Sequence, residues 1–332
     1  MDVDDLLDTS DDEGEEGLVC RQRVFRPRIN FDSFCVMEFK ERFRLRPNEA
    51  EFVVTRLAPR LIDSNKNMAL TPRQQLLVAL HWLGNGSQYH GIGDMHGVSK
   101  STVCRSLKRV VNAIVDLLFQ EIVRFPDETS DLAYKFMRKG GFPCVAGCAD
   151  GTLINIIAPS HNEAAYVDRE GNHSINVLMV CGPDLSFYFV SARWPGSVHD
   201  SRVMQNSTIY RKFESDSAYG LRDWLIRPIH RNPNDVLEQR FNAAQKSTRR
   251  IIENAYGVMK ARFPCLRYLR VNPVFAGKII MACATLHNIA ANEDFEDNGH
   301  ADNGHAEDID IGFPGVSVSS ERRINDLMQF FT

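Results

Sequence analysis

Apolar positions between residues 31 and 122 recur with the period of an α-helix, and this stretch contains no strand-like alternation. Cap and proline signals predict where three of the helices begin. These signals are Asp32 and Ser33 before residues 34–39, Pro47 opening residues 47–61, and Thr71 with Pro72 opening residues 73–83. The pattern therefore predicts a small helical domain at this end of the chain.

The pattern changes at residue 142. Short apolar runs typical of β-strands follow at residues 143–149, 152–157, 174–180 and 186–191, the last three bounded by turn residues. The first run ends at Asp150 and Gly151, so we expect a turn there, with the Asp150 carboxylate at a strand end. Helical periodicity returns at residues 243–263 and 276–291. Strands followed by helices predict an α/β or α+β domain.

Charge is divided unevenly along the chain. Residues 1–17 hold nine acids and residues 291–310 hold eight, and neither stretch contains Lys or Arg. Without these 17 acids, 26 of the 43 remain against 39 Lys and Arg, so the rest of the chain is about +13. This split is common in nucleic-acid-binding proteins, although a soluble protein with solvated tails has it too. We expect four segments: an acidic disordered tail at 1–30, a helical domain at 31–125, a mixed domain at 140–292, and an acidic linker and tail at 293–332.

Several classes of protein are disfavoured by what the sequence lacks. The sequence contains no uninterrupted run of about 18 apolar residues, so it predicts no membrane span. The eight cysteines form no CxxC pair, so reduced core thiols are expected rather than disulfides or a zinc site. No phosphate-binding loop or G-x-S-x-G elbow is present, which disfavours an NTPase and a serine hydrolase.

Residues 92–112 have the pattern of a helix-turn-helix. Residues 92–96 form a short helix, Gly97 and Val98 the turn, and Ser99 the cap of a helix that runs through Asn112. In a major groove this second helix would present a set of polar and basic residues to DNA: Ser99, Lys100, Ser101, Thr102, Arg105 and Arg109. A plain amphipathic helix of a bundle remains the alternative.

Three acids are candidates for metal-dependent chemistry. Asp150 follows an apolar run, Asp216 precedes residues 217–220, and Glu253 lies on the helix at 243–263. Converging carboxylates repel unless divalent cations neutralise them, and two Mg²⁺ ions about 3.5–4 Å apart would activate water for phosphodiester hydrolysis. Each acid also has a purely structural explanation, as a strand-end cap, a turn residue and an i,i+4 partner of Arg249.

An ordered series of sequence motifs resembles the PIF/Harbinger DDE transposases, especially their domesticated nuclease relatives. The motifs are CADGT at 148–152, WPGSVHDSRV at 194–203, DSAY at 216–219, RRIIENAYG at 249–257 and LHN at 286–288. The resemblance extends over residues 48–292. It implies an α/β protein in which a ribonuclease-H-like catalytic domain, the DDE superfamily endonuclease domain at 140–292, follows an all-α helix-turn-helix domain.

The resemblance implies a catalytic and metal-binding triad of Asp150, Asp216 and Glu253, with Mg²⁺ or Mn²⁺ as cofactor. It also implies a DNA substrate, work in the nucleus and a Myb-like partner protein. A cytoplasmic pool and a homo-oligomer are left open. On the helix that carries Glu253, basic residues are expected to contact DNA phosphates: Arg249, Arg250, Lys260 and Arg262.

One segment departs from the family pattern. Members of the family have a hydrophobic strand before the second Asp, whereas here residues 209–215 run directly into Asp216. Either residues 213–215 form a shorter edge strand, or Asp216 is displaced and catalysis is impaired; Asp200 is a candidate substitute ligand. The sequence therefore supports two hypotheses, a metal-dependent DNA nuclease and a DNA-binding or adaptor protein that keeps the fold. A small-molecule phosphoesterase would leave the helix-turn-helix unexplained.

Overall fold

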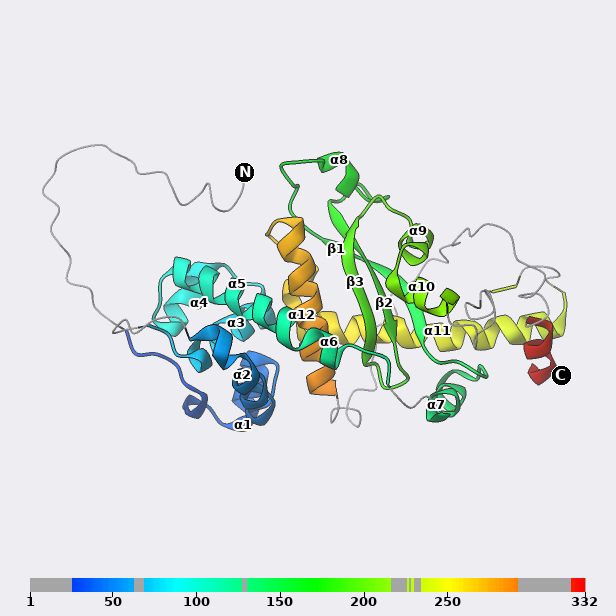
Figure 1. Ribbon diagram of the computed structural model, residues 1–332, viewed down its shortest axis with the longest axis horizontal. Coiled ribbons are helices and arrows are strands. Elements are labelled where there is room, and N and C mark those ends of the chain that lie inside the picture. The colour runs from blue at the N-terminus through cyan, green and yellow to red at the C-terminus, as the bar shows by residue number, and fades with distance from the viewer. Residues whose placement is uncertain are drawn as a thin grey trace, which may run out of the picture.

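A computed structural model of the chain describes residues 26–62, 69–126, 130–215, 226, 228–229, 234–291 and 324–331 (Figure 1). The acidic tail expected at 1–30 therefore lies outside the described residues except for its last five, as does residue 216. The predicted linker at 293–332 is described only at 324–331.

The described residues before the first strand form helices and no strand. These elements are η2 (Phe31–Ser33), α1 (Val36–Phe43), α2 (Pro47–Leu61), α3 (Pro72–Asn85), α4 (Tyr89–His96), α5 (Lys100–Leu117), α6 (Phe119–Ile122) and α7 (Ser130–Gly140). The predicted starts at Pro47 and Pro72 are confirmed, and the Thr71 hydroxyl accepts a hydrogen bond from the Gln74 N–H. The caps predicted for α1 are wrong: Asp32 and Ser33 belong to η2, and Cys35 is the N-cap.

The sheet has three antiparallel strands in the order β1 (Cys148–Asn155), β2 (Ser174–Cys181) and β3 (Phe187–Pro195). The predicted turn after Asp150 is wrong, because β1 continues through Asp150, Gly151 and Thr152, which pair with residues 177–179 of β2. Residues 143–147 are not a strand, and the runs predicted at 143–149 and 152–157 overlap a single strand. Asp150 consequently lies within β1 and not at its end.

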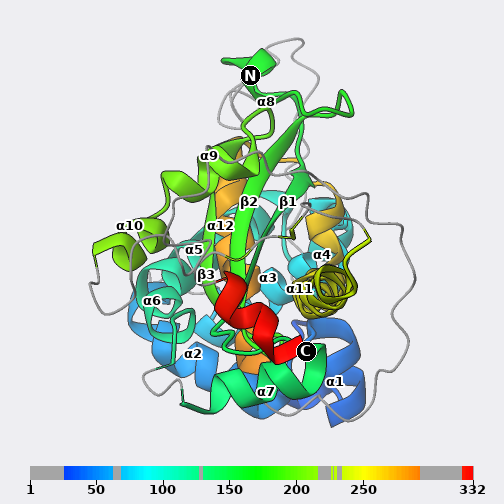
Figure 2. The same ribbon diagram turned by 90° about the vertical axis from the view of Figure 1, so that its right-hand side faces the viewer.

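Helices cover both faces of this sheet. The helices in this part of the chain are α8 (Glu163–Tyr166), α9 (Asp200–Gln205), α10 (Thr208–Ser215), α11 (Val236–Arg262), η3 (Pro264–Arg267) and α12 (Pro273–Ala291), with η4 (Gln329–Phe331) near the C-terminus. Figure 2 shows α9 and α10 on one side of the strands and α11, viewed along its axis, on the other. The helices predicted at 243–263 and 276–291 are confirmed as α11 and α12, each with an earlier start.

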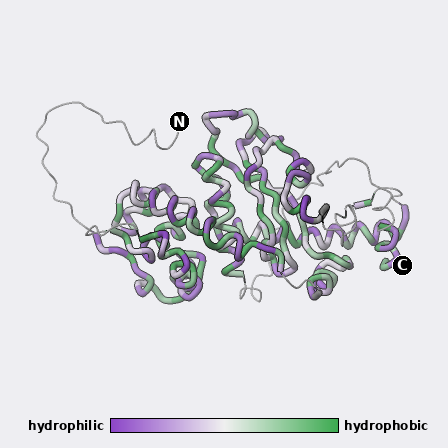
Figure 3. Tube along the Cα trace, in the orientation of Figure 1, coloured by the Kyte–Doolittle hydropathy of each residue, from purple (hydrophilic) through white to green (hydrophobic). Residues whose placement is uncertain are grey.

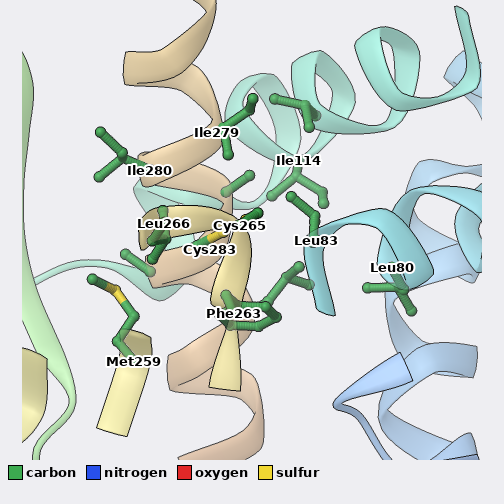
Figure 4. Close-up of a cluster of buried hydrophobic side chains, with 14 of the residues drawn as sticks. Leu80, Leu83, Ile114, Met259, Phe263, Cys265, Leu266, Ile279, Ile280 and Cys283 are labelled. Atoms are coloured by element: carbon green, nitrogen blue, oxygen red, sulfur yellow. The ribbon is translucent and has the colours of Figure 1, made fainter. Parts of the chain in front are cut away.

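One hydrophobic core joins the N-terminal helices to the sheet and to α12. Figure 4 shows its central part, where Leu80 and Leu83 of α3 and Ile114 of α5 meet side chains of α11, η3 and α12. In Figure 3 hydrophobic residues follow the strands and α12, while the part of α11 beyond the sheet is mainly hydrophilic. The helical region and the sheet are thus packed as one body.

Helix α12 is long and apolar enough to cross a membrane, yet 78% of its apolar stretch is buried inside the structure. The core helix of a globular protein has the same properties, so this is weak evidence for a membrane span. Of the seven cysteines among the described residues, all free thiols, four are buried as core residues (Cys148, Cys181, Cys265 and Cys283), whereas Cys35 and Cys144 are exposed.

Candidate active site

Asp150 points from the middle of β1 toward α11. Its side chain is 9% exposed. Because side chains alternate along a strand, Asp150 shares its face with Met179, its partner on β2, which belongs to the core that includes α11. The Tyr256 hydroxyl of α11 donates a hydrogen bond of 2.6 Å to the backbone carbonyl of Asp150. Strand and helix are therefore tied together at the first acid of the predicted triad.

Glu253 approaches the same place from α11, and Arg249 lies between the two acids. The Arg249 Nη2 atom is 3.4 Å from Asp150 Oδ2, and its Nε atom is 3.9 Å from Glu253 Oε1. The i,i+4 pair of Arg249 and Glu253 expected from the sequence is thus present. Its guanidinium also reaches Asp150, so two predicted triad acids face one cation.

Burial raises the pKa of the Asp150 carboxyl to about 6. Arg249 and the backbone N–H of Gly151 oppose this rise, whereas the negative charges of Asp200 and Glu253 add to it. A desolvated carboxylate with two further acids nearby favours a positive charge at this position. Carboxylate oxygens are also the ligands that Mg²⁺ prefers, so the chemistry of these groups fits a divalent cation.

Asp200 lies on the other side of β1, at the first turn of α9. Its carboxylate lies against Gly151, and its Oδ1 accepts a hydrogen bond of 2.6 Å from the Asn176 amide of β2. The same amide donates to the Val198 backbone carbonyl at 2.7 Å. The N-cap of α9 is His199, and Asp200 is the first residue of the helix, held by Asn176.

Asp216, the second acid of the predicted triad, lies outside the described residues. The residues immediately before it are helical, since α10 extends to Ser215. The shorter edge strand considered for residues 213–215 is therefore wrong. Within the part of the chain that the structure describes, no three His, Cys, Asp or Glu side chains come together as a metal site.

The residues of the predicted helix-turn-helix lie in α4 and α5 and in the turn between them. Gly97 has a φ of 65°, the left-handed conformation that ends α4, and the Ser99 hydroxyl accepts the Thr102 N–H at 3.2 Å as the cap of α5. At this end of α5 the Ser99 hydroxyl also lies within hydrogen-bonding distance of the hydroxyls of Ser101 and Thr102. Lys100, Arg105 and Arg109 are exposed.

The four residues of α11 predicted to contact DNA phosphates have different surroundings. Arg250 is exposed, and Arg249 lies between the acids. Lys260 donates a hydrogen bond of 3.0 Å to the Thr152 hydroxyl of β1, and Arg262 donates to the His287 backbone carbonyl of α12 at 3.4 Å. Two of the four are thus engaged inside the fold.

Asn176 and Tyr256 were not among the residues predicted from the sequence. A polar residue in the otherwise apolar run at 174–180 is a signal, because a buried amide needs hydrogen-bond partners. Tyr256 had no such signal, since it is one of several large residues on the apolar face of α11 and its partner is a backbone carbonyl.

Comparison with known proteins gives a consistent result. Residues 149–288 match the DDE superfamily endonuclease family. The chain is 35% identical over 244 residues to "Putative nuclease HARBI1" of Homo sapiens, covering 68% of this chain and 69% of the human one. It is 31% identical over 250 residues to the protein of the same name from Xenopus laevis, covering 70% and 72%. Identity to "Protein ALP1-like" of Arabidopsis thaliana is 27% over 254 residues, covering 68% and 62%. No solved structure matches the chain.

Proposed function

The chain belongs to the Harbinger-derived family of DDE-superfamily nucleases, and we propose that it is itself a divalent-metal-dependent nuclease that hydrolyses DNA phosphodiester bonds. The observation that carries this proposal is the convergence of Asp150 and Glu253 on one guanidinium. Two acids 103 positions apart in the sequence face a common point that attracts positive charge.

Asp150, Asp216 and Glu253 would hold Mg²⁺ or Mn²⁺. When bound, such a cation supplies a nucleophilic water at neutral pH and stabilises the leaving oxygen. Arg249 balances the charge of Asp150 and Glu253, and Tyr256 fixes the main chain of β1 against α11.

We further propose a ribonuclease-H-like catalytic domain preceded by an all-α helix-turn-helix domain. The antiparallel strands β1 to β3 with α11 on one face support the first, and α4, Gly97 and α5 support the second. In DNA binding, α5 would present residues 99–102 to base edges, which requires its hydroxyls to exchange partners. The exposed Arg105, Arg109 and Arg250 would contact phosphates.

We also propose that the protein works in the nucleus with a Myb-like partner, as the resemblance to the family implies. The basic body of the chain, about +13 without its acidic stretches, supports a nucleic-acid substrate.

A second function is favoured by one specific observation. Helix α10 runs to Ser215, so the backbone that leads into Asp216 is helical, where the family has a strand. If this geometry keeps Asp216 away from Asp150 and Glu253, the protein binds DNA without cleaving it and acts as an adaptor.

Cleavage of a labelled DNA duplex with Mg²⁺ or Mn²⁺ tests both functions. The wild type is compared with Asp150→Asn, Asp216→Asn and Glu253→Gln, and with Glu41→Gln as a control at an exposed acid of α1. Metal-dependent cleavage that all three site variants lose, and the control keeps, would establish the nuclease. Binding without cleavage in the wild type would establish the adaptor. Full cleavage by Asp216→Asn would show that Asp216 is not a catalytic or metal-binding residue.

A further inference from the structure

A pocket of about 270 Å³ opens on the structure at the end of β3, beside α9 and α10. It is lined by Arg193 and Trp194 of β3, by Asn206, which ends α9, and by Arg211 of α10. The described residues that line it include two arginines and no acid. Its volume is below that of a drug-sized ligand site and suits a small group such as a phosphate.

The arginine on β3 is held in place by its neighbours. The Arg193 guanidinium lies 5.6 Å from the centre of the Trp194 ring, and its Nη2 donates to the Asn206 backbone carbonyl at 3.3 Å. These contacts restrain a long side chain, which lowers the entropy lost when it binds a ligand. The indole Nε1 of Trp194 is buried without a hydrogen-bond partner among the described residues.

The pocket is linked to the candidate active site by a short series of contacts. Trp194 pairs with Asn176 across β2 and β3, and Asn176 donates to Asp200, whose carboxylate lies against Gly151. Helix α9 begins at Asp200 and ends beside the pocket at Asn206, a separation of about 9 Å at 1.5 Å per residue. The pocket and Asp200 thus lie at opposite ends of α9, on the side of the sheet away from α11.

We propose that this pocket binds a backbone phosphate of DNA, outside the bond that is cleaved, with Arg193 and Arg211 as its ligands. Planar guanidinium groups match the geometry of phosphate oxygens. The described lining contains no carboxylate that would neutralise the two arginines, so the pocket favours a bound anion. This proposal rests on the proposed function in one respect: it assumes that the protein binds DNA, but not that it cleaves DNA.

The test is the salt dependence of DNA binding, measured by fluorescence anisotropy with a short duplex in the presence of EDTA. Each phosphate contact adds about 0.9 to the slope of log affinity against log salt concentration. The Arg193→Ala/Arg211→Ala variant is expected to bind more weakly, with the slope reduced by about 1, because one phosphate contact is lost, while the variant with lysine at both positions recovers part of it. Arg138→Ala is the matched control, because Arg138 is an exposed arginine that stacks on Tyr134 in the same way on α7.

The slope separates this inference from the nuclease, and competition by inorganic phosphate separates DNA from free phosphate as the ligand. A normal slope in the double-alanine variant overturns the phosphate site even if the protein cleaves DNA. A reduced slope in the double-alanine variant supports the phosphate site even if the wild type binds DNA without cleaving it, a result that would contradict the proposed nuclease. Inorganic phosphate that competes with the duplex no better than sulfate at equal ionic strength supports the polymer as ligand, whereas strong competition by phosphate alone identifies a free-phosphate pocket and overturns the proposal.

Discussion

The carboxylate of Asp200 lies so close to Gly151 that a Cβ atom at residue 151 would be only 2.3 Å from its Oδ1. Glycine at this position thus serves close packing within β1, because the strand passes through it without a turn. A side chain here would displace a carboxylate that Asn176 holds.

Gly151→Ala is therefore expected to destabilise the protein by about 1–3 kcal/mol, since an added methyl group has to push Asp200 away from Asn176. The free energy of unfolding, measured by urea denaturation, checks this. Gly257→Ala is the matched control. Nothing lies within 4 Å of a Cβ at Gly257, and in the interior of α11 alanine should stabilise by up to about 1 kcal/mol. Equal stability of Gly151→Ala and wild type would contradict the packing seen here.

A second prediction concerns pH. His81 and His96 are buried and joined by a hydrogen bond of 2.9 Å between Nδ1 and Nε2, and burial lowers the pKa of both, that of His96 to about 4. In the unfolded chain the pKa returns to about 6.5, so below that pH the unfolded state binds more protons than the folded state. Stability contributed by neutral His96 is fully present above pH 6.5 and is lost as the pH falls toward 4.

For His96 alone this loss amounts to roughly 2 kcal/mol at pH 5. Thermal unfolding followed between pH 7.5 and 4.5 should show it, and His96→Gln should be less stable at pH 7.5 but lose less stability on acidification. Parallel pH curves for His96→Gln and the wild type would rule out His96 as a source of the acid sensitivity.

Helix starts could be predicted from the sequence because their chemistry is local. Pro47, Thr71 and Pro72 act on the first turn of their own helices, and the structure has α2 and α3 beginning there. The cap of α1 was missed because the Glu38 carboxylate accepts the backbone N–H of Cys35, which makes Cys35 the N-cap in place of a better capping residue.

The errors at β1 and the site have tertiary causes. A glycine after an apolar run locally indicates a turn. This prediction failed because Gly151 instead makes room for Asp200, 49 positions later in the sequence. The i,i+4 spacing of Arg249 and Glu253 was readable, whereas the reach of Arg249 to Asp150 depends on how α11 lies across β1. Local patterns carry no information about such packing.

Arg250 and Lys260 are expected to behave differently, although both are basic residues of α11. Burial lowers the pKa of Lys260, which donates to the Thr152 hydroxyl, whereas Arg250 is exposed. Lys260→Ala should lower the free energy of unfolding by about 1–2 kcal/mol through lost packing and an unpaired hydroxyl. Arg250→Ala should leave stability within about 0.5 kcal/mol and reduce the salt slope of DNA binding by about 1.

Urea denaturation and the anisotropy titration measure these two effects separately. Lys135→Ala, at an exposed lysine of α7, controls for the loss of one positive charge. A reduced slope with unchanged stability in Lys260→Ala would mean that Lys260 contacts phosphate and not the inside of the fold.

The last described residues, 324–331, contribute to stability although they follow a long acidic stretch. Leu327 is 1% exposed and packs in a cluster with Phe142, Ile229 and Phe241, and Arg240 of α11 donates to the Phe331 backbone carbonyl at 3.0 Å. Truncating a buried leucine leaves a cavity, so Leu327→Ala should cost about 2–4 kcal/mol. Hydrogen exchange should then increase in the first turns of α11, which this cluster covers.

Phe330→Ala is the control in the same segment, because Phe330 is 65% exposed and its loss should leave both stability and exchange unchanged. If Leu327→Ala were as stable as Phe330→Ala, the segment would not hold α11, and its burial at Leu327 would have no energetic consequence.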